Sequence, residues 1–229
     1  MQNSNMKVTI LQFPGTNCEY DTQHAFEQLG AKTEIVWHKN ESIPSDTNLL
    51  VVAGGFSYGD YLRSGAIAKF SPVMKAVTEY ANNGGKVLGI CNGFQVLTEA
   101  GLLPGALKRN DGLHFISKHH TLQVINNDNI FLEKLNNGDV VNIPIAHHDG
   151  NYFIDEDGLK ELESNNQILL KYTDANGDVK NPNGSVESIA GVCNKEKNVF
   201  GLMPHPERAM ESILGSDDGI KMLEGFLRA

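Results

Sequence analysis

One cysteine of this chain lies where a buried strand is predicted to turn directly into a helix. The predicted strand Lys86–Ile90 precedes Cys91, and a helix-like run begins at Asn92. Glycines at positions 89 and 93 flank the turn, where larger side chains would crowd a substrate that approaches the sulfur. Because the N-terminus of a helix favours thiolate over thiol, we expect Cys91 to be an activated nucleophile.

A histidine and a glutamate two residues apart could serve this nucleophile. Prolines on both sides of His205 predict extended backbone, in which alternate side chains point the same way. Glu207 is then expected to hold one imidazole nitrogen of His205 while the other faces Cys91. The predicted chemistry is acyl transfer through a thioester at Cys91, with His205 moving the proton to the leaving nitrogen.

The oxyanion formed in such a reaction needs hydrogen-bond donors. The N–H of Asn92, directly after the nucleophile, is one candidate. The glycine-rich loop that follows the predicted strand Leu49–Ala53 supplies Gly55 and Phe56 as further backbone donors. Loss of one such donor typically costs about 3 kcal/mol of transition-state stabilisation.

The other cysteines and two histidine pairs are predicted to have no chemical role. Cys18 and Cys193 lack a context typical of reactive thiols, so we expect both to be structural. Adjacent histidines at 119–120 and 147–148 would point to opposite sides of a strand, and no third ligand stands at a useful spacing. We therefore expect no metal site, and we expect these histidines to lie in solvated loops.

Strands and helices alternate along the first hundred residues. Apolar and β-branched runs predict strands at 8–11, 33–37, 49–53 and 86–90, and apolar periodicity predicts helices at 19–29 and 66–81. Such alternation implies right-handed crossovers and a parallel sheet, whose ligands gather at the carboxyl ends of the strands.

The second half of the chain is less regular. We expect antiparallel or edge strands at 121–125 and 139–143, a hairpin of 188–194 with 198–202, and a closing helix at 217–227. The predicted fold class is α/β, a single-domain, open, mostly parallel sheet with helices on both faces, of flavodoxin-like type. Residues 1–6 are expected to be a flexible N-terminus and residues 7–229 the domain.

The composition excludes several classes of function. The 229 residues are 40% hydrophobic, enough for one substantial core, and the net charge of −9 argues against a nucleic-acid partner. Three scattered cysteines form no disulfide framework, which favours a reducing cytoplasm. No apolar stretch approaches the roughly 20 residues that a membrane span needs, so we expect no membrane association.

Several segments resemble the class I glutamine amidotransferase family, which releases ammonia from glutamine with a Cys-His-Glu triad. The segments are Gly89–Gln95 and Pro204–Arg208. The resemblance implies that Cys91 is the nucleophile, His205 the general acid and base, and Glu207 its orienting carboxylate. It also implies that Gln95 helps to bind the glutamine substrate.

Further segments narrow the resemblance to the glutaminase subunits of phosphoribosylformylglycinamidine synthase. They are Ala53–Arg63, Asn181–Ser185 and Met203–Arg208, and the likeness covers nearly the whole chain. One departure is the segment Ala146–Gly150, Ala-His-His-Asp-Gly, where that family often has Ala-His-Gly-Glu-Gly. The altered loop leaves the predicted triad intact.

The resemblance also implies partners. A larger synthetase subunit would use the ammonia and ATP to convert formylglycinamide ribonucleotide to the amidine in de novo purine synthesis, and a small bridging subunit would join them. No segment fits a P-loop, so we expect no cofactor in this chain, with ATP and Mg²⁺ on the synthetase subunit. Because free ammonia escapes into water, we expect activity to depend on the partner, with an incomplete oxyanion hole or a loose glycine loop in the isolated chain.

Three alternatives remain open from the residues alone. The chain could be the glutaminase subunit of another biosynthetic amidotransferase, such as one for imidazole glycerol phosphate or pyridoxal phosphate. It could be a free-standing cysteine hydrolase of γ-glutamyl compounds, which would use the same triad. It could also be a non-catalytic regulatory subunit, although the complete triad argues against that.

Overall fold

One long sheet organises the computed structural model, which describes residues 6–228. Its strands are β1 (Lys7–Gln12), β2 (Lys32–Trp37), β3 (Leu49–Val52), β4 (Lys86–Ile90), β6 (Ile116–Val124), β7 (Val140–His147), β9 (Ile168–Thr173), β10 (Ile189–Cys193) and β11 (Val199–Leu202). They follow the order β2-β1-β3-β4-β11-β10-β9-β6-β7. A separate antiparallel pair joins β5 (Ala106–Lys108) to β8 (Asn151–Phe153). Except for Met6, the predicted flexible N-terminus lies outside the described residues.

The half of the sheet from β2 to β11 is parallel and has the predicted flavodoxin-like order. All four residues of β3 are fully buried, as expected for a strand covered on both faces. These strands were predictable from the sequence because they are apolar runs that alternate with helical segments along the chain, as in a parallel sheet covered by helices. The predicted α/β class is confirmed.

The half from β11 to β7 is antiparallel. The predicted hairpin corresponds to β10 and β11, and the two predicted edge or antiparallel strands correspond to β6 and β7. The strand β9, which lies between β10 and β6, was not among the predicted elements, and neither was the β5–β8 pair. These elements extend the sheet beyond the flavodoxin-like half.

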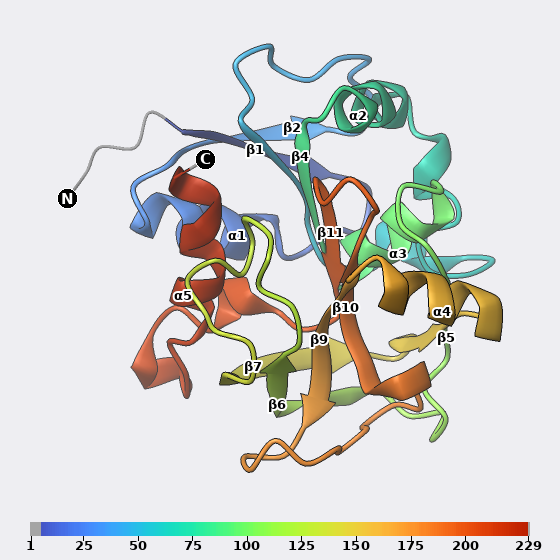
Figure 1. The fold of residues 1–229 in the computed structure, drawn as a ribbon. Helices are drawn as coiled ribbons and strands as arrows, with labels where there is room; N and C mark the ends of the chain where they lie inside the picture. Colours follow the sequence, from blue (N-terminus) through green and yellow to red (C-terminus); the bar gives the residue numbers. More distant parts are fainter. Residues whose placement is uncertain (1–5, 229) are drawn as a thin grey trace.

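Helices cover both faces of the sheet (Figure 1). Helices α1 (Glu19–Gln28) and α5 (Gly219–Glu224) lie on one side, and α2 (Val73–Asn82), α3 (Asn92–Glu99) and α4 (Glu156–Ser164) lie on the other. Short 3₁₀ turns occupy Ser57–Asp60, Ala68–Phe70, Val186–Ser188, Pro206–Arg208, Ser212–Leu214 and Gly225–Arg228. Within residues 6–228, no helix has both the length and the apolar character to cross a membrane.

The predicted helix at 66–81 is wrong in its first part. Pro72 is the N-cap of α2, and only the short 3₁₀ turn Ala68–Phe70 precedes it. Proline disfavours a helical conformation in the residue before it, and Ser71 is indeed extended, with ψ of 144°. Apolar periodicity alone therefore placed the start of the helix about two turns too early.

Both predicted catalytic segments leave the sheet at the same edge. Strands β4 and β11 are parallel neighbours, with Ile90 opposite Leu202, and the Cys91 N–H donates to the Leu202 carbonyl at 2.8 Å. Strand β7 also reaches this edge, because the His205 N–H donates to the Pro144 carbonyl at 2.8 Å. The fold thus brings three distant segments together at one place.

Candidate active site

Cys91 occupies a strained turn between β4 and α3. Its φ of 51° and ψ of −107° are unusual for a residue with a side chain and cost of order 1–3 kcal/mol. It is the N-cap residue of α3, so the first N–H groups of the helix lie beside it. The predicted strand–nucleophile–helix turn is present, and its strain is a feature common at functional sites.

The flanking glycines have a different role from the predicted one. A Cβ on Gly93 would lie 1.8 Å from the Val52 carbonyl oxygen, and a Cβ on Gly89 would lie 2.6 Å from Leu97 Cδ1. These positions are filled by the protein itself. The glycines therefore allow α3 to pack closely on β3 and β4, and the idea that they make room for a substrate is wrong.

His205 and Glu207 form a buried pair, although their backbone is not extended as predicted. Pro206–Arg208 is a 3₁₀ turn, which brings the two side chains together by curvature. The His205 Nδ1 and Glu207 Oε1 atoms are 2.7 Å apart, and both residues are at most 4% exposed. Since the carboxylate can only accept, the proton of this bond lies on Nδ1.

The environment of His205 favours its charged form. Burial lowers the pKa of His205, but the charge of Glu207 and interactions with Cys91 and Cys18 outweigh burial and raise the pKa well above its usual value. Among the described residues, the other nitrogen, Nε2, makes no hydrogen bond of good geometry. Cys91 Sγ lies 3.6 Å from the Ala146 carbonyl oxygen, so the end of β7 also borders the nucleophile.

Asn92 and Gln95 tie the helix α3 to two loops. The Asn92 Oδ1 accepts from the Ser57 N–H at 3.0 Å, and its Nδ2 donates to Gln95 Oε1 at 2.8 Å. Gln95 Nε2 in turn donates to the Asp149 carbonyl at 2.7 Å. Gln95 therefore stands beside the nucleophile and in direct contact with the 146–150 loop that departs from the family pattern.

The predicted oxyanion donors differ in whether their N–H groups already donate a hydrogen bond. Asn92 opens α3, so its N–H has no partner within the helix. The Phe56 N–H donates to the Gly15 carbonyl at 2.9 Å and is committed to that bond in this conformation. Gly55 precedes it with φ of 145°, a conformation that L side chains rarely adopt.

An acidic pair beside the site was not predicted. Asp60 accepts from Asn92 Nδ2 at 3.2 Å, and Asp149 accepts from the Ser64 hydroxyl at 2.9 Å. Burial, and then the charge of Asp149, raise the pKa of Asp60 to about 6. The sequence places the two aspartates far apart, so only the fold reveals that they interact.

The prediction of solvated loop histidines is wrong for His120 and His147, which are both buried. His147 ends β7, is 3% exposed, and its Nδ1 lies 3.1 Å from Asn110 Oδ1. Burial, and then the nearby His205, lower the pKa of His147 to about 4, so it is neutral at physiological pH. His120 is buried within β6, and its Nε2 lies 2.8 Å from the Lys180 carbonyl oxygen.

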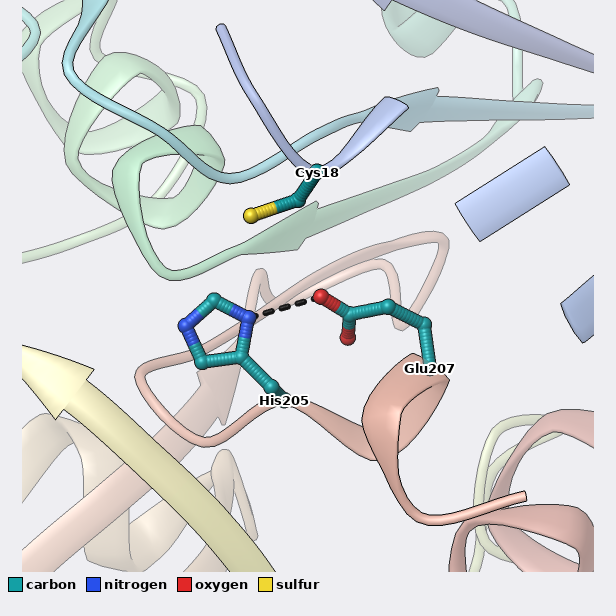
Figure 2. Close-up of side chains that lie close together, drawn as sticks. All are labelled: Cys18, His205 and Glu207. Atoms are coloured by element: carbon teal, nitrogen blue, oxygen red, sulfur yellow. Dashed lines mark hydrogen bonds and ion pairs between the residues drawn. The ribbon is translucent and has the colours of Figure 1, made fainter. Parts of the chain in front are cut away.

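Cys18 lies beside the predicted base, which sequence spacing did not indicate. Arg208 donates to the Cys18 sulfur at 3.1 Å, and the thiol itself donates to Asn17 Oδ1 at 3.1 Å. Figure 2 shows its side chain converging with those of His205 and Glu207. The available signal was topological, because Cys18 follows β1 at the carboxyl edge of the parallel strands. Cys193 is fully buried in β10, as predicted.

Comparisons with known proteins identify the family of this chain. Residues 5–218 match the family model described as a CobB/CobQ-like glutamine amidotransferase domain. The chain is 82% identical to the phosphoribosylformylglycinamidine synthase subunit PurQ of Sulfurimonas denitrificans, over 98% of this chain and all of that protein. It is 57% identical to the PurQ subunit of Campylobacter jejuni, over 97% of this chain and 96% of that one.

Solved structures give the same picture. A chain in the structure of PurLQS from Thermotoga maritima matches with a TM-score of 0.87 and 41% identity, covering 97% of this chain and 98% of that one. Another protein of Thermotoga maritima, described as a glutamine amidotransferase, has a TM-score of 0.58 at 15% identity, over 89% of this chain and 76% of that one. The second likeness concerns the fold alone.

Proposed function

This chain belongs to the CobB/CobQ-like glutamine amidotransferase family, and we propose that Cys91, His205 and Glu207 carry out its glutaminase reaction. It is the glutaminase subunit of phosphoribosylformylglycinamidine synthase and acts in purine biosynthesis. The observation that supports the residue assignment is the strained Cys91 beside an imidazole that Glu207 holds at 2.7 Å.

The first step forms a thioester. The Cys91 thiolate attacks the side-chain amide carbon of glutamine, and the carbonyl oxygen becomes an oxyanion. Protonated His205 then gives its Nε2 proton to the amide nitrogen, which leaves as ammonia when the C–N bond breaks. The raised pKa of His205 suits this role, because the imidazolium is the populated proton donor.

The second step returns the enzyme to its starting state. His205, now neutral, takes a proton from water, and the hydroxide adds to the thioester carbon. The second tetrahedral intermediate expels the Cys91 thiolate, which restores the thiolate–imidazolium pair and releases glutamate. Gln95, whose side chain bonds to Asn92 and to the Asp149 carbonyl beside the nucleophile, is proposed to bind the glutamine substrate.

The oxyanion site is proposed to be incomplete until a partner docks. The Asn92 N–H can donate from the start of α3, whereas the Phe56 N–H is held by Gly15. A rotation of the Gly55–Phe56 peptide segment would free a second donor, and each such donor is worth about 3 kcal/mol of transition-state stabilisation. Glutaminase rates that are equal with and without the synthetase subunit would contradict this proposal.

Exposed apolar side chains near the site support a docking face, which we call the rim. The rim consists of Phe56, Tyr61, Leu62, Leu113 and Phe115, each between 43% and 91% exposed. The Phe56 and Phe115 rings lie 6.4 Å apart, so the two loops that carry the rim meet. A larger synthetase subunit seated on the rim would seal the exit of ammonia from water.

The remaining parts of the reaction are assigned to other subunits. The synthetase subunit, joined by a small bridging subunit, would bind ATP and Mg²⁺ and convert formylglycinamide ribonucleotide to formylglycinamidine ribonucleotide. The structure named PurLQS from Thermotoga maritima supports this division, because it contains a chain that is 41% identical to this one and its name lists further subunits. We place the reaction in the cytoplasm, where purine synthesis and reduced thiols are expected.

Substitution of the nucleophile tests the proposed function directly. In the assembled synthase, Cys91→Ala should reduce glutamine-dependent synthesis to background, because no thioester can form. Synthesis from added ammonium salt should stay within about twofold of wild type, because the synthetase chemistry is untouched. Product formation with each nitrogen source is the measurement.

Matched variants and a covalent probe make the result specific. Cys193→Ala removes another buried thiol and should keep both activities. A glutamine-like electrophile should label Cys91, as mapped by mass spectrometry after digestion. Labelling at Cys18 or Cys193, or loss of the ammonia-dependent activity in Cys91→Ala, would show that the assignment is wrong.

A further inference from the structure

We propose that Cys18, His205 and Glu207 form an inhibitory site for a thiophilic divalent metal ion such as Zn²⁺. One ligand atom from each residue lies within 4.8 Å of the others, and residues 6–228 hold no other group of three such side chains this close together. Figure 2 shows the three side chains converging from two distant parts of the chain. The inhibitory effect rests on the proposed role of His205, whereas metal binding itself does not.

The three residues supply a set of ligands that zinc prefers. A thiolate, an imidazole nitrogen and a carboxylate oxygen bind Zn²⁺ at about 2.0–2.3 Å, which leaves the ligand atoms roughly 3–4 Å from one another. The observed spread of at most 4.8 Å therefore requires only a small contraction.

Two buried polar atoms at this site have unused bonding capacity. Among the described residues, His205 Nε2 and Glu207 Oε2 have no hydrogen-bond partner, although both residues are almost completely buried. Unpartnered polar atoms in a protein interior are uncommon and costly. Both atoms belong to proposed ligand residues, so a bound ion would use capacity that the protein leaves open.

Gly54 keeps the space between two of the ligands open. A Cβ at this position would lie 3.0 Å from His205 Cε1 and 3.1 Å from Cys18 Sγ. Any larger residue would push the imidazole and the thiol apart. The close approach of Cys18, which follows β1, to His205 therefore depends on Gly54.

The local charges also suit a divalent cation. Arg208 contacts the Cys18 sulfur, but its Nε also pairs with Asp21 Oδ2 at 2.9 Å, so its charge has a partner. The Cys18 thiolate and the Glu207 carboxylate then supply two negative charges for the two positive charges of the ion. Binding would displace the thiol proton of Cys18 and the Nδ1 or Nε2 proton of an imidazolium, and both would go to solvent.

Occupation of this site would stop catalysis through His205. A neutral imidazole has one nitrogen lone pair, and a bound metal ion uses it. The imidazole could then neither accept a proton from water nor carry the extra proton that the leaving ammonia needs. The metal would thus block both steps through His205.

The first experiment uses Co²⁺ as a spectroscopic probe on the isolated chain. A bound cobalt ion with a thiolate ligand has a strong sulfur-to-metal charge-transfer absorption. We expect this absorption in the double variant Cys91→Ser/Cys193→Ala, in which Cys18 is the remaining thiol of the chain. Glu207→Gln on the same background should weaken Co²⁺ binding by at least about tenfold.

The absorption should be lost when Cys18 is replaced by serine in the wild-type background. Circular dichroism checks that this variant folds, and Cys18→Ala replaces it if it does not. An absorption that persists without Cys18, or that is missing from the double variant, would overturn the proposal.

The second experiment measures inhibition in the assembled synthase. Zn²⁺ should inhibit glutamine-dependent synthesis, and EDTA should reverse the inhibition. Relative to each variant's own zinc-free rate, Cys18→Ser should require at least about tenfold more Zn²⁺ for half inhibition, whereas Cys193→Ala should match wild type. Equal zinc sensitivity of Cys18→Ser and wild type would refute the inhibitory role. The cobalt spectra report metal binding independently of the glutaminase assignment.

Discussion

Glu207 controls the protonation of His205, and the consequence is a prediction about pH. The carboxylate raises the pKa of His205, so the proton donor persists to higher pH than an isolated imidazole would allow. In Glu207→Gln the pKa of His205 falls. As pH rises, the imidazolium of the variant therefore loses its proton at a lower pH than that of wild type. The alkaline limb of glutamine-dependent activity should move to lower pH, and the rate at neutral pH should fall at least about tenfold.

The pH profile of glutamine-dependent synthesis by the assembled synthase is the measurement. Asp21→Asn is the matched control, because the carboxylate of Asp21 pairs with Arg208, whereas that of Glu207 pairs with His205. Its alkaline limb should stay where it is in wild type. An unmoved limb in Glu207→Gln would mean that the carboxylate orients His205 without setting its charge.

At the scale of elements, the packing of α3 on the sheet depends on Gly93. A Cβ there would lie 1.8 Å from the Val52 carbonyl oxygen, which is backbone and cannot rotate away. Gly93→Ala should therefore lift the start of α3 and destabilise the fold by about 3 kcal/mol or more. Urea unfolding measures this loss. Gly112→Ala is the control, because its nearest neighbour would be 4.0 Å away, and its stability should remain within about 0.5 kcal/mol of wild type.

The end of β7 gives the fold a specific sensitivity to acid. The pKa of His147 falls from 6.5 in the unfolded chain to about 4 in the fold, so the unfolded chain binds the extra proton throughout this window. The stability contributed by neutral His147 is present above pH 6.5 and is lost as pH falls towards 4, by up to about 3 kcal/mol. His147→Gln should lose less stability over this range.

Urea unfolding at pH 7 and pH 4.5 compares the two proteins. The exposed His24, replaced in the same way, provides a control that should lose as much stability as wild type. If His147→Gln and wild type lose the same stability between the two pH values, another group is responsible for the acid sensitivity.

These elements also show what the sequence could reveal. The parallel strands and the Cys91 turn were predictable because buried strands, glycines and helix starts are local patterns. By contrast, the environment of His147 and the position of Cys18 depend on contacts between distant segments. The bent backbone at Pro206 was missed because proline fits both an extended strand and the first position of a helical turn.

For the whole molecule, the rim predicts where the synthetase subunit binds. Leu62 is 91% exposed, and its φ is positive at 70°. Because the side chain packs against little in the isolated chain, Leu62→Asp should change the free energy of unfolding of that chain by less than about 0.5 kcal/mol. A charge buried without a partner in the interface should weaken assembly with the synthetase by at least about tenfold. Sedimentation of mixtures at a series of concentrations measures the affinity.

Ile213 provides the matched control for that experiment. It is 88% exposed and belongs to the 3₁₀ turn Ser212–Leu214, away from the rim loops in the fold (Figure 1). Ile213→Asp should leave assembly unchanged. If both variants weaken assembly equally, the synthetase contacts a wider surface than the rim.

The last strand of the chain, β11, lies in the middle of the sheet, between β4 and β10. While a ribosome synthesises the protein, Cys91 emerges long before β11 and His205. Until β11 is made, the edge of β4 that will pair with it has no partner strand. A nascent polypeptide can therefore hold Cys91 in its turn and still lack His205. The reactive pair can therefore exist only after the segment that carries His205 has been synthesised.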